Sequence, residues 1–283
     1  MDADRDLAVI VGDGWLRRER AELLKLLHRL EADDWRRPTE CPQWDVKQVA
    51  VHVLGDDLSL LSRQRDQSVD GLSLFAATHP GASFSEMLNG FNEQWVTAST
   101  FLSTSVLIEL LEWSGEQTAT FYEQVDLSDL GEPVGFFGST TPSPYWQIVA
   151  REFVERWTHQ HQIRRATNNA VLGHDYLAIA TGVFAHSIAM RLDDLGMPDG
   201  TTVTLQIPEV TAWTFRWTAD RSEWMLDSGI NSAAVATILI NAPTAIRLFT
   251  RGPVSVETAD VITTSGNTSI ANKALMAMGN VFS

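Results

Sequence analysis

The most suggestive local pattern for chemistry is a glutamate followed four residues later by a histidine, Glu155 and His159. Residues four apart lie on one face of a helix, so this carboxylate and imidazole could bind the same metal ion. The spacing alone is weak, because 36 acids in 283 residues give seven histidines about one such pair by chance. A metal site and an ordinary surface pair therefore both fit. His161 falls on the other side of the helix.

His52 lies in an otherwise apolar stretch, with Val49 and Val53 on the same side of an expected helix. A buried imidazole needs a partner, because an unsatisfied buried polar group costs about 1–3 kcal/mol. Two interpretations stay open. His52 is either a core histidine bonded to a backbone carbonyl or carboxylate, or a metal ligand.

Cys41 is the only cysteine, and it lies in a loop just before that helix. A single cysteine excludes an internal disulfide and a cysteine-rich zinc cluster. A thiol near a helix N-terminus could act as a nucleophile, whereas structural filling of the loop is the other interpretation. The chain has no glycine-rich phosphate loop, Gly-x-Ser-x-Gly elbow or His-Glu-x-x-His motif. Any metal site must therefore use histidines and carboxylates.

Helical periodicity dominates the first 170 residues, which favours a helix bundle. Asp45 is the expected N-cap of the helix that carries His52. Loops rich in Gly, Pro and Ser are expected over 68–82 and 126–143. The pattern predicts helices over about 5–31, 45–67, 84–103, 104–125, 144–168 and 174–194.

After residue 170 the pattern changes to short β-like runs with late helices, which indicates an α+β domain. A length of 283 residues also favours two domains. The predicted strands are Thr202–Ile207, Trp213–Thr218, Trp224–Leu226, Val235–Ile240 and Val254–Glu257, and the late helices cover about 243–250 and 267–280.

The composition, 44% hydrophobic and 20% charged, is that of a globular protein. A net charge of −15 disfavours nucleic acids and anionic membranes as partners. No apolar run approaches the roughly 20 residues of a membrane helix, and the first residues do not resemble a signal peptide, so a cytoplasmic protein is expected. Residues 66–150 hold eleven acids and no Lys or Arg, a distribution that aids solubility or favours a cationic partner.

The run from Trp35 to Gly55, WRRPTECPQWDVKQVAVHVLG, closely resembles the opening motif of the mycothiol-dependent maleylpyruvate isomerase family. That family belongs to the DinB-like superfamily of metal-binding helix bundles. Its signature is a Trp, a Pro-Thr-x-Cys-Pro-x-Trp turn, a valine-rich helix and a His followed by Leu-Gly.

The second part of the signature, Glu, three residues and His, matches the run REFVERWTHQHQIR over 151–164. The family binds its metal with one His from the second helix and with this Glu and His. The resemblance therefore implies His52, Glu155 and His159 as metal ligands. The family pattern commonly continues with an Asp three residues after the second His, where this chain has Gln162.

The run NAPTAIRLFTRG over 241–252, followed by Gly266-Asn267 where relatives often have Gly-Asp, resembles the family's second domain. That domain is similar to sterol-carrier proteins. The resemblance thus covers nearly the whole chain. It implies an N-terminal all-α, DinB-like four-helix bundle in residues 1–172 and a smaller α+β, sterol-carrier-like C-terminal domain in residues 173–283.

Two imidazoles and one carboxylate leave positions open on a divalent, zinc-like ion. In the family this ion binds mycothiol, the low-molecular-weight thiol of actinobacteria, and favours its thiolate. The thiolate adds to the double bond of maleylpyruvate, rotation follows, and elimination releases the trans isomer. Arg247 and Arg251 are candidate catalytic residues that would hold the substrate carboxylates, and surface arginines are the other interpretation.

The resemblance implies a cytoplasmic enzyme, a monomer or homodimer, that uses mycothiol as an isomerase or thiol S-transferase on a small electrophile. Two alternatives remain. One is a metal hydrolase with an activated water, which would turn over esters or amides without mycothiol. The other is a non-enzymatic, metal-containing ligand-binding protein, which a fully closed coordination sphere would favour.

Overall fold

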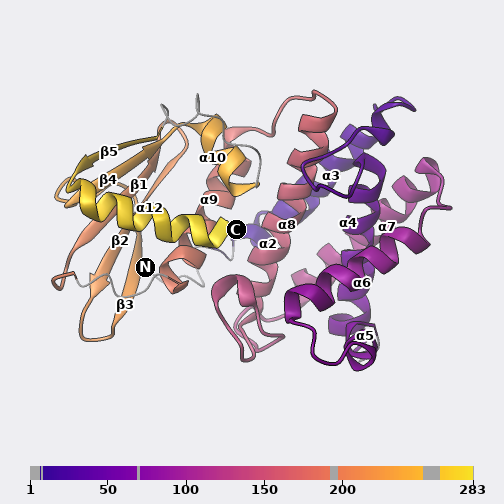
Figure 1. Ribbon diagram of the computed structural model, residues 1–283, viewed down its shortest axis with the longest axis horizontal. Helices are drawn as coiled ribbons and strands as arrows, with labels where there is room; N and C mark the ends of the chain where they lie inside the picture. Colours follow the sequence, from indigo (N-terminus) through magenta and orange to yellow (C-terminus); the bar gives the residue numbers. More distant parts are fainter. Residues whose placement is uncertain (1–6, 8, 69–70, 192–196, 251–261, 283) are drawn as a thin grey trace. The chain divides into compact units, whose positions relative to one another are not determined.

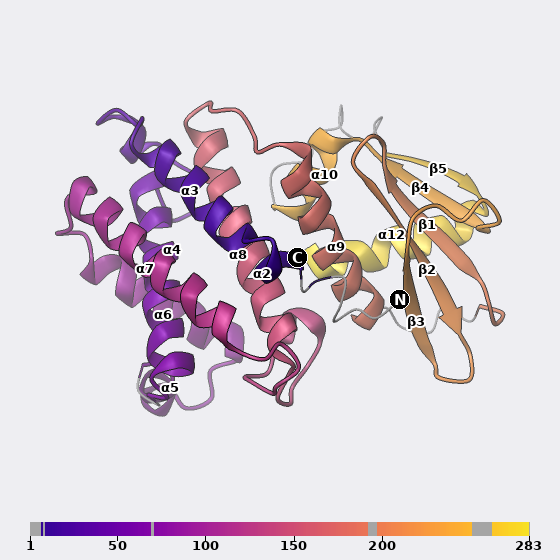
Figure 2. The same ribbon diagram turned by 180° about the vertical axis from the view of Figure 1, so that it is seen from behind.

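The computed structural model describes residues 7, 9–68, 71–191, 197–250 and 262–282 (Figure 1; Figure 2). The helices of this part of the chain are α2 (Val9–Gly12), α3 (Trp15–Leu27), α4 (Val46–Leu60), α5 (Leu72–Thr78), α6 (Phe84–Ala98), α7 (Thr104–Gln124), α8 (Tyr145–Ala166), α9 (His174–Arg191), α10 (Ala242–Phe249) and α12 (Thr268–Phe282). Short helical turns are η1 (Asp34–Arg36), η2 (Leu61–Arg65) and η3 (Gly135–Phe137). The strands are β1 (Thr202–Ile207), β2 (Thr211–Thr218), β3 (Glu223–Ser228), β4 (Ala236–Ile240) and β5 (Ile262–Gly266).

The chain divides into two compact units. The helical unit comprises residues 11–125 and 159–170, and its regular elements in the described residues are all helices. The mixed unit comprises residues 1–10, 126–158 and 171–283 and contains the β-sheet. An all-α part and an α+β part confirm the coarse fold class that the sequence predicts. The four-helix, DinB-like and sterol-carrier-like details stay predictions, as does a boundary between residues 172 and 173.

Helix α4 begins where the sequence predicts it, at the N-cap Asp45. The Asp45 carboxylate accepts a hydrogen bond from the Gln48 N–H at 2.9 Å, and the Gln48 side-chain oxygen accepts one from the Asp45 N–H at 2.9 Å. This reciprocal capping box satisfies two N–H groups that a helix start leaves open. The apolar residues of α4 then pack against α6 and α7. Buried members of this core include Leu23, Leu27, Val49, Val53, Leu54, Leu107, Leu111 and Ile163.

Gly55 on α4 allows helix α6 to approach closely. A Cβ atom at Gly55 would lie 2.4 Å from the Trp95 side chain, a distance that no packed core tolerates. The same indole donates a hydrogen bond to the Val51 carbonyl at 2.8 Å. Packing therefore explains why the signature run has a glycine three residues after His52.

Two local predictions for the helical region were wrong. The expected helix over 5–31 is interrupted, because Gly14 adopts a left-handed backbone with φ of 66° and separates α2 from α3. The expected loop over 68–82 contains helix α5. Its Phe75 ring packs edge-on against Phe91 of α6, with ring centroids 5.9 Å apart, so a tertiary contact stabilises a helix that the Gly- and Ser-rich context obscured.

The sheet has the strand order β3-β2-β1-β4-β5. Strands β1 and β4 are parallel, whereas the other neighbouring pairs are antiparallel. Helices α9 and α12 contact the sheet, as Figure 1 shows for α12. Four predicted strands match β1–β4 in place, and the fifth, Val254–Glu257, lies outside the described residues. Strand β5 was missed because its sequence, ITTSG, is mostly polar and lies at a sheet edge.

None of the helices in the described residues is both long enough and apolar enough to span a membrane.

Candidate metal centre

His52 lies on α4, two turns after the capping box, and only 4% of its surface is exposed. The turn that precedes α4 places an aromatic ring beside it. The Thr39 hydroxyl donates a hydrogen bond to the Trp44 carbonyl at 2.7 Å, and the Trp44 ring lies 4.8 Å from the His52 ring, centroid to centroid. The signature turn thus restricts the orientation of the His52 imidazole, because a large ring packs against it.

His159 lies on α8 and faces His52 across the helical unit. The two imidazole rings meet edge to face, with centroids 4.7 Å apart and an interplanar angle of 84°. Glu155 lies one turn earlier on α8. Ligand atoms of these three side chains all lie within 4.8 Å of one another. The structure therefore brings together the three residues that the family resemblance implies, and they are called the histidine–glutamate cluster below.

Charged neighbours surround this cluster. The His52 Nε2 atom lies 3.5 Å from the Asp56 carboxylate, one turn further along α4. Arg151 lies one turn before Glu155 on α8, and its Nη2 atom is 3.4 Å from the Glu155 carboxylate. Arg151 therefore partly balances the Glu155 charge and limits its rotamers, while Asp56 adds a second carboxylate beside the His52 imidazole.

Gln162 and Cys41 join His159, a connection that the sequence analysis did not predict. The His159 Nδ1 atom lies 2.8 Å from the Gln162 Oε1 atom. The Cys41 thiol donates to the same oxygen at 3.2 Å. The position where the family commonly has Asp thus contacts the candidate ligand in this chain through an amide. The sequence signal for this contact is that His159 and Gln162 lie three residues apart, a spacing that places two side chains on one face of a helix.

A buried ion pair links the helix that carries His52 to its neighbours. Arg20 of α3 contacts Asp57 of α4 at 2.7 Å, with side chains 6% and 0% exposed. The Ser114 hydroxyl of α7 donates to the same carboxylate at 2.6 Å, and Arg20 donates to the Leu111 carbonyl at 2.6 Å. A Cβ atom at Gly115 would lie 2.7 Å from Arg20, so this glycine gives the guanidinium room. Sequence reasoning missed this network.

Of the two candidate catalytic arginines, only Arg247 lies in the part of the chain that the structure describes. Arg247 is exposed on α10. Arg251 lies outside the described residues. Their catalytic role stays a prediction.

The acid-rich segment 66–150 has some of its charge paired within the helical unit. Arg17 of α3 bonds both Glu116 and Glu123 of α7. The guanidinium lowers the pKa of Glu123, mainly through this hydrogen bond. These contacts fit a solvated helix face that joins α3 to α7.

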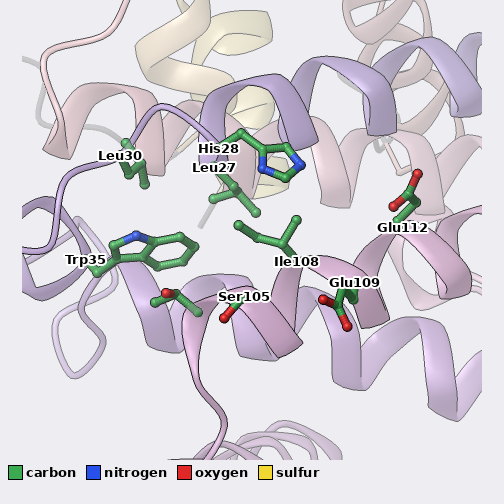
Figure 3. Close-up of a pocket in the computed structure, with 9 residues that line it drawn as sticks. Leu27, His28, Leu30, Trp35, Ser105, Ile108, Glu109 and Glu112 are labelled. Carbon is green, nitrogen blue, oxygen red and sulfur yellow. The ribbon is translucent and has the colours of Figure 1, made fainter.

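A pocket of about 280 Å³ lies on the helical unit between the end of α3 and the start of α7 (Figure 3). Its apolar lining includes Leu27, Trp35 and Ile108, and its polar lining includes His28 and Glu112. The members of the histidine–glutamate cluster are not among the residues that line it. This pocket and the candidate metal centre are therefore different features of the protein.

The fold and the cluster together define a class of protein with an all-α unit and an α+β unit, in which helices α4 and α8 carry two histidines and a glutamate in a metal-binding arrangement. The family model for the mycothiol maleylpyruvate isomerase N-terminal domain matches residues 16–164, and the chain belongs to this family. This match confirms the resemblance that the signature runs indicated.

Solved structures agree on the fold. A crystal structure of the mycothiol-dependent maleylpyruvate isomerase is 13% identical in sequence, with a TM-score of 0.51 over 94% of this chain and 93% of that one. A histidine-to-alanine mutant of that isomerase gives 12% identity and the same TM-score and coverage. No curated protein matches the chain.

Proposed function

We propose that the protein is a metal-dependent enzyme that uses mycothiol, as an isomerase or thiol S-transferase, on a small electrophilic substrate. The observation that carries this proposal is the meeting of His52, Glu155 and His159 in a chain of the mycothiol maleylpyruvate isomerase family. The proposed metal is zinc, and the proposed setting is the actinobacterial cytoplasm, where mycothiol is the abundant thiol.

The donor set fits a zinc-like ion. Neutral imidazole nitrogens and a carboxylate oxygen are ligands that zinc accepts, and three protein ligands leave a position open. Atoms bound about 2 Å from one ion lie at most about 4 Å apart. The three ligand atoms lie within 4.8 Å of one another, so only a small side-chain movement would bring them to one ion. Glu155 can make most of this movement, because its side chain has more rotatable bonds than a histidine.

When bound, such an ion lowers the pKa of a coordinated thiol, so that the thiolate is available at neutral pH. The chain supplies the surroundings. Trp44 packs on His52, which limits access of water to that side of the imidazole. Arg151 holds the Glu155 carboxylate. A small electrophile with an activated double bond would then form a carbon–sulfur bond with the thiolate. The reaction is an isomerisation if this carbon–sulfur bond breaks again, and an S-transfer if it persists.

Mycothiol should stabilise the protein only when metal is bound. At a concentration one hundred times its Kd, a ligand adds about 2.7 kcal/mol of stability, which corresponds to roughly 5–10 °C in melting temperature for a chain of this size. The measurement is thermal unfolding of zinc-loaded and zinc-stripped protein with mycothiol. S-methyl mycothiol is the matched ligand control, because it cannot form a thiolate and should give a much smaller shift.

Equal shifts with and without metal would contradict the proposal. Turnover separates the alternatives: isomerisation of maleylpyruvate or conjugation of an electrophile that requires mycothiol supports it. Ester or amide hydrolysis without thiol would instead support the metal hydrolase.

A further inference from the structure

The amide of Gln162 is the centre of a small buried network at the candidate metal centre. Gln162 is 4% exposed and His159 is 8% exposed. The Gln162 Oε1 atom lies 2.8 Å from His159 Nδ1 and 3.2 Å from Cys41 Sγ. Both distances are within hydrogen-bonding range, the longer one being ordinary for sulfur.

The chemistry of the amide oxygen decides which partner donates. A carboxamide oxygen has lone pairs and no proton, so it can only accept hydrogen bonds. His159 must therefore carry a proton on Nδ1 to bond it, and Cys41 must donate its S–H. A neutral imidazole carries one proton, so this arrangement leaves the lone pair on Nε2.

We propose that Gln162 is a positioning residue that holds His159 in the Nδ1-protonated tautomer and thereby presents Nε2 as the metal ligand. This inference rests on the proposed metal site. Partners of this kind orient ligand imidazoles and set their basicity, and their removal typically lowers metal affinity about 10–100-fold. An amide here does this without the negative charge of the Asp that is common at this position in the family.

Cys41 contacts the same amide oxygen as His159 but is not a candidate metal ligand. Its thiol donates a hydrogen bond to the Gln162 Oε1 atom, and Cys41 is not among the side chains that could hold the ion. Cys41→Ala removes one donor and leaves the Gln162–His159 contact in place. This substitution is therefore the matched control for loss of Gln162.

The test uses the full chain and two readouts. The first is Zn²⁺ affinity by competition with a chelating dye, for which we expect Gln162→Leu to bind about 10–100-fold more weakly. Gln162→Glu, which keeps an acceptor at this position, should restore wild-type affinity or exceed it, and Cys41→Ala should bind as the wild type does. Thermal unfolding shows whether each variant is folded.

The second readout is the His159 tautomer, measured by ¹⁵N NMR of histidine-labelled protein without metal. Wild type and Cys41→Ala should show the Nδ1-protonated form, whereas Gln162→Leu should show a mixture or the other form. A wild-type His159 protonated on Nε2, or a folded Gln162→Leu with unchanged tautomer and affinity, would overturn the inference.

The two readouts separate this inference from the proposed function. If His159→Ala binds Zn²⁺ as tightly as the wild type, the proposed metal site fails. The tautomer measurement still supports or overturns the role of Gln162, because it needs no metal.

Discussion

Replacement of His52 or His159 by alanine is expected to abolish tight binding of a divalent metal ion. Each variant removes one of three clustered ligand side chains. A four-ligand structural zinc site is worth about 10–16 kcal/mol, or about 3 kcal/mol for each ligand, so affinity should fall by roughly 100-fold or more. The measurement is metal content of the purified protein, followed by Zn²⁺ titration against a competing chelator.

His28→Ala is the matched control for these variants. His28 is an exposed histidine at the end of α3 and is not part of the cluster, so metal binding should not change. Retention of one ion per chain by both His52→Ala and His159→Ala would rule out the cluster as the metal site. Absence of metal binding by the wild type would rule it out as well.

Replacement of Asp57 by alanine is expected to destabilise the helical unit strongly. The substitution leaves the Arg20 guanidinium buried without its carboxylate, and it removes the acceptor of the Ser114 hydroxyl. Breaking one side of a buried ion pair costs about 3–5 kcal/mol, which corresponds to roughly 6–20 °C in melting temperature. Urea and thermal unfolding measure this loss, and because Asp57 lies five residues after His52, metal affinity should fall in parallel.

Two further variants make the expectation specific. Asp33→Ala removes an exposed partner of Arg36 and should leave stability unchanged, because surface ion pairs contribute little. The double replacement Arg20→Met with Asp57→Leu should recover much of the loss, because removal of both charges leaves no buried ion unpaired. A melting temperature of Asp57→Ala close to that of Asp33→Ala would show that the buried pair does not hold α3, α4 and α7 together.

The sequence by itself determined the elements whose causes are local. The capping residue Asp45 and its partner Gln48 lie three residues apart, so the start of α4 could be predicted. Helical and strand periodicities likewise depend on neighbours a few residues away, which is why α7 and β1 lie within a residue or so of their predicted ranges. The signature runs also indicated the family, because they combine residue types that a helical pattern alone does not require.

Only the tertiary structure decided which of these residues meet. His52 and His159 are 107 positions apart in the chain, and the packing of α4 against its neighbours brings their rings to 4.7 Å. Cys41 reaches Gln162 in the same way. Contacts of this kind depend on which faces are buried together and on small residues such as Gly55 that permit close approach. Periodicity within one helix shows which face is apolar but not which partner covers it. The family resemblance, not periodicity, therefore indicated that His52 joins Glu155 and His159, and packing alone revealed the contact of Gln162 with Cys41.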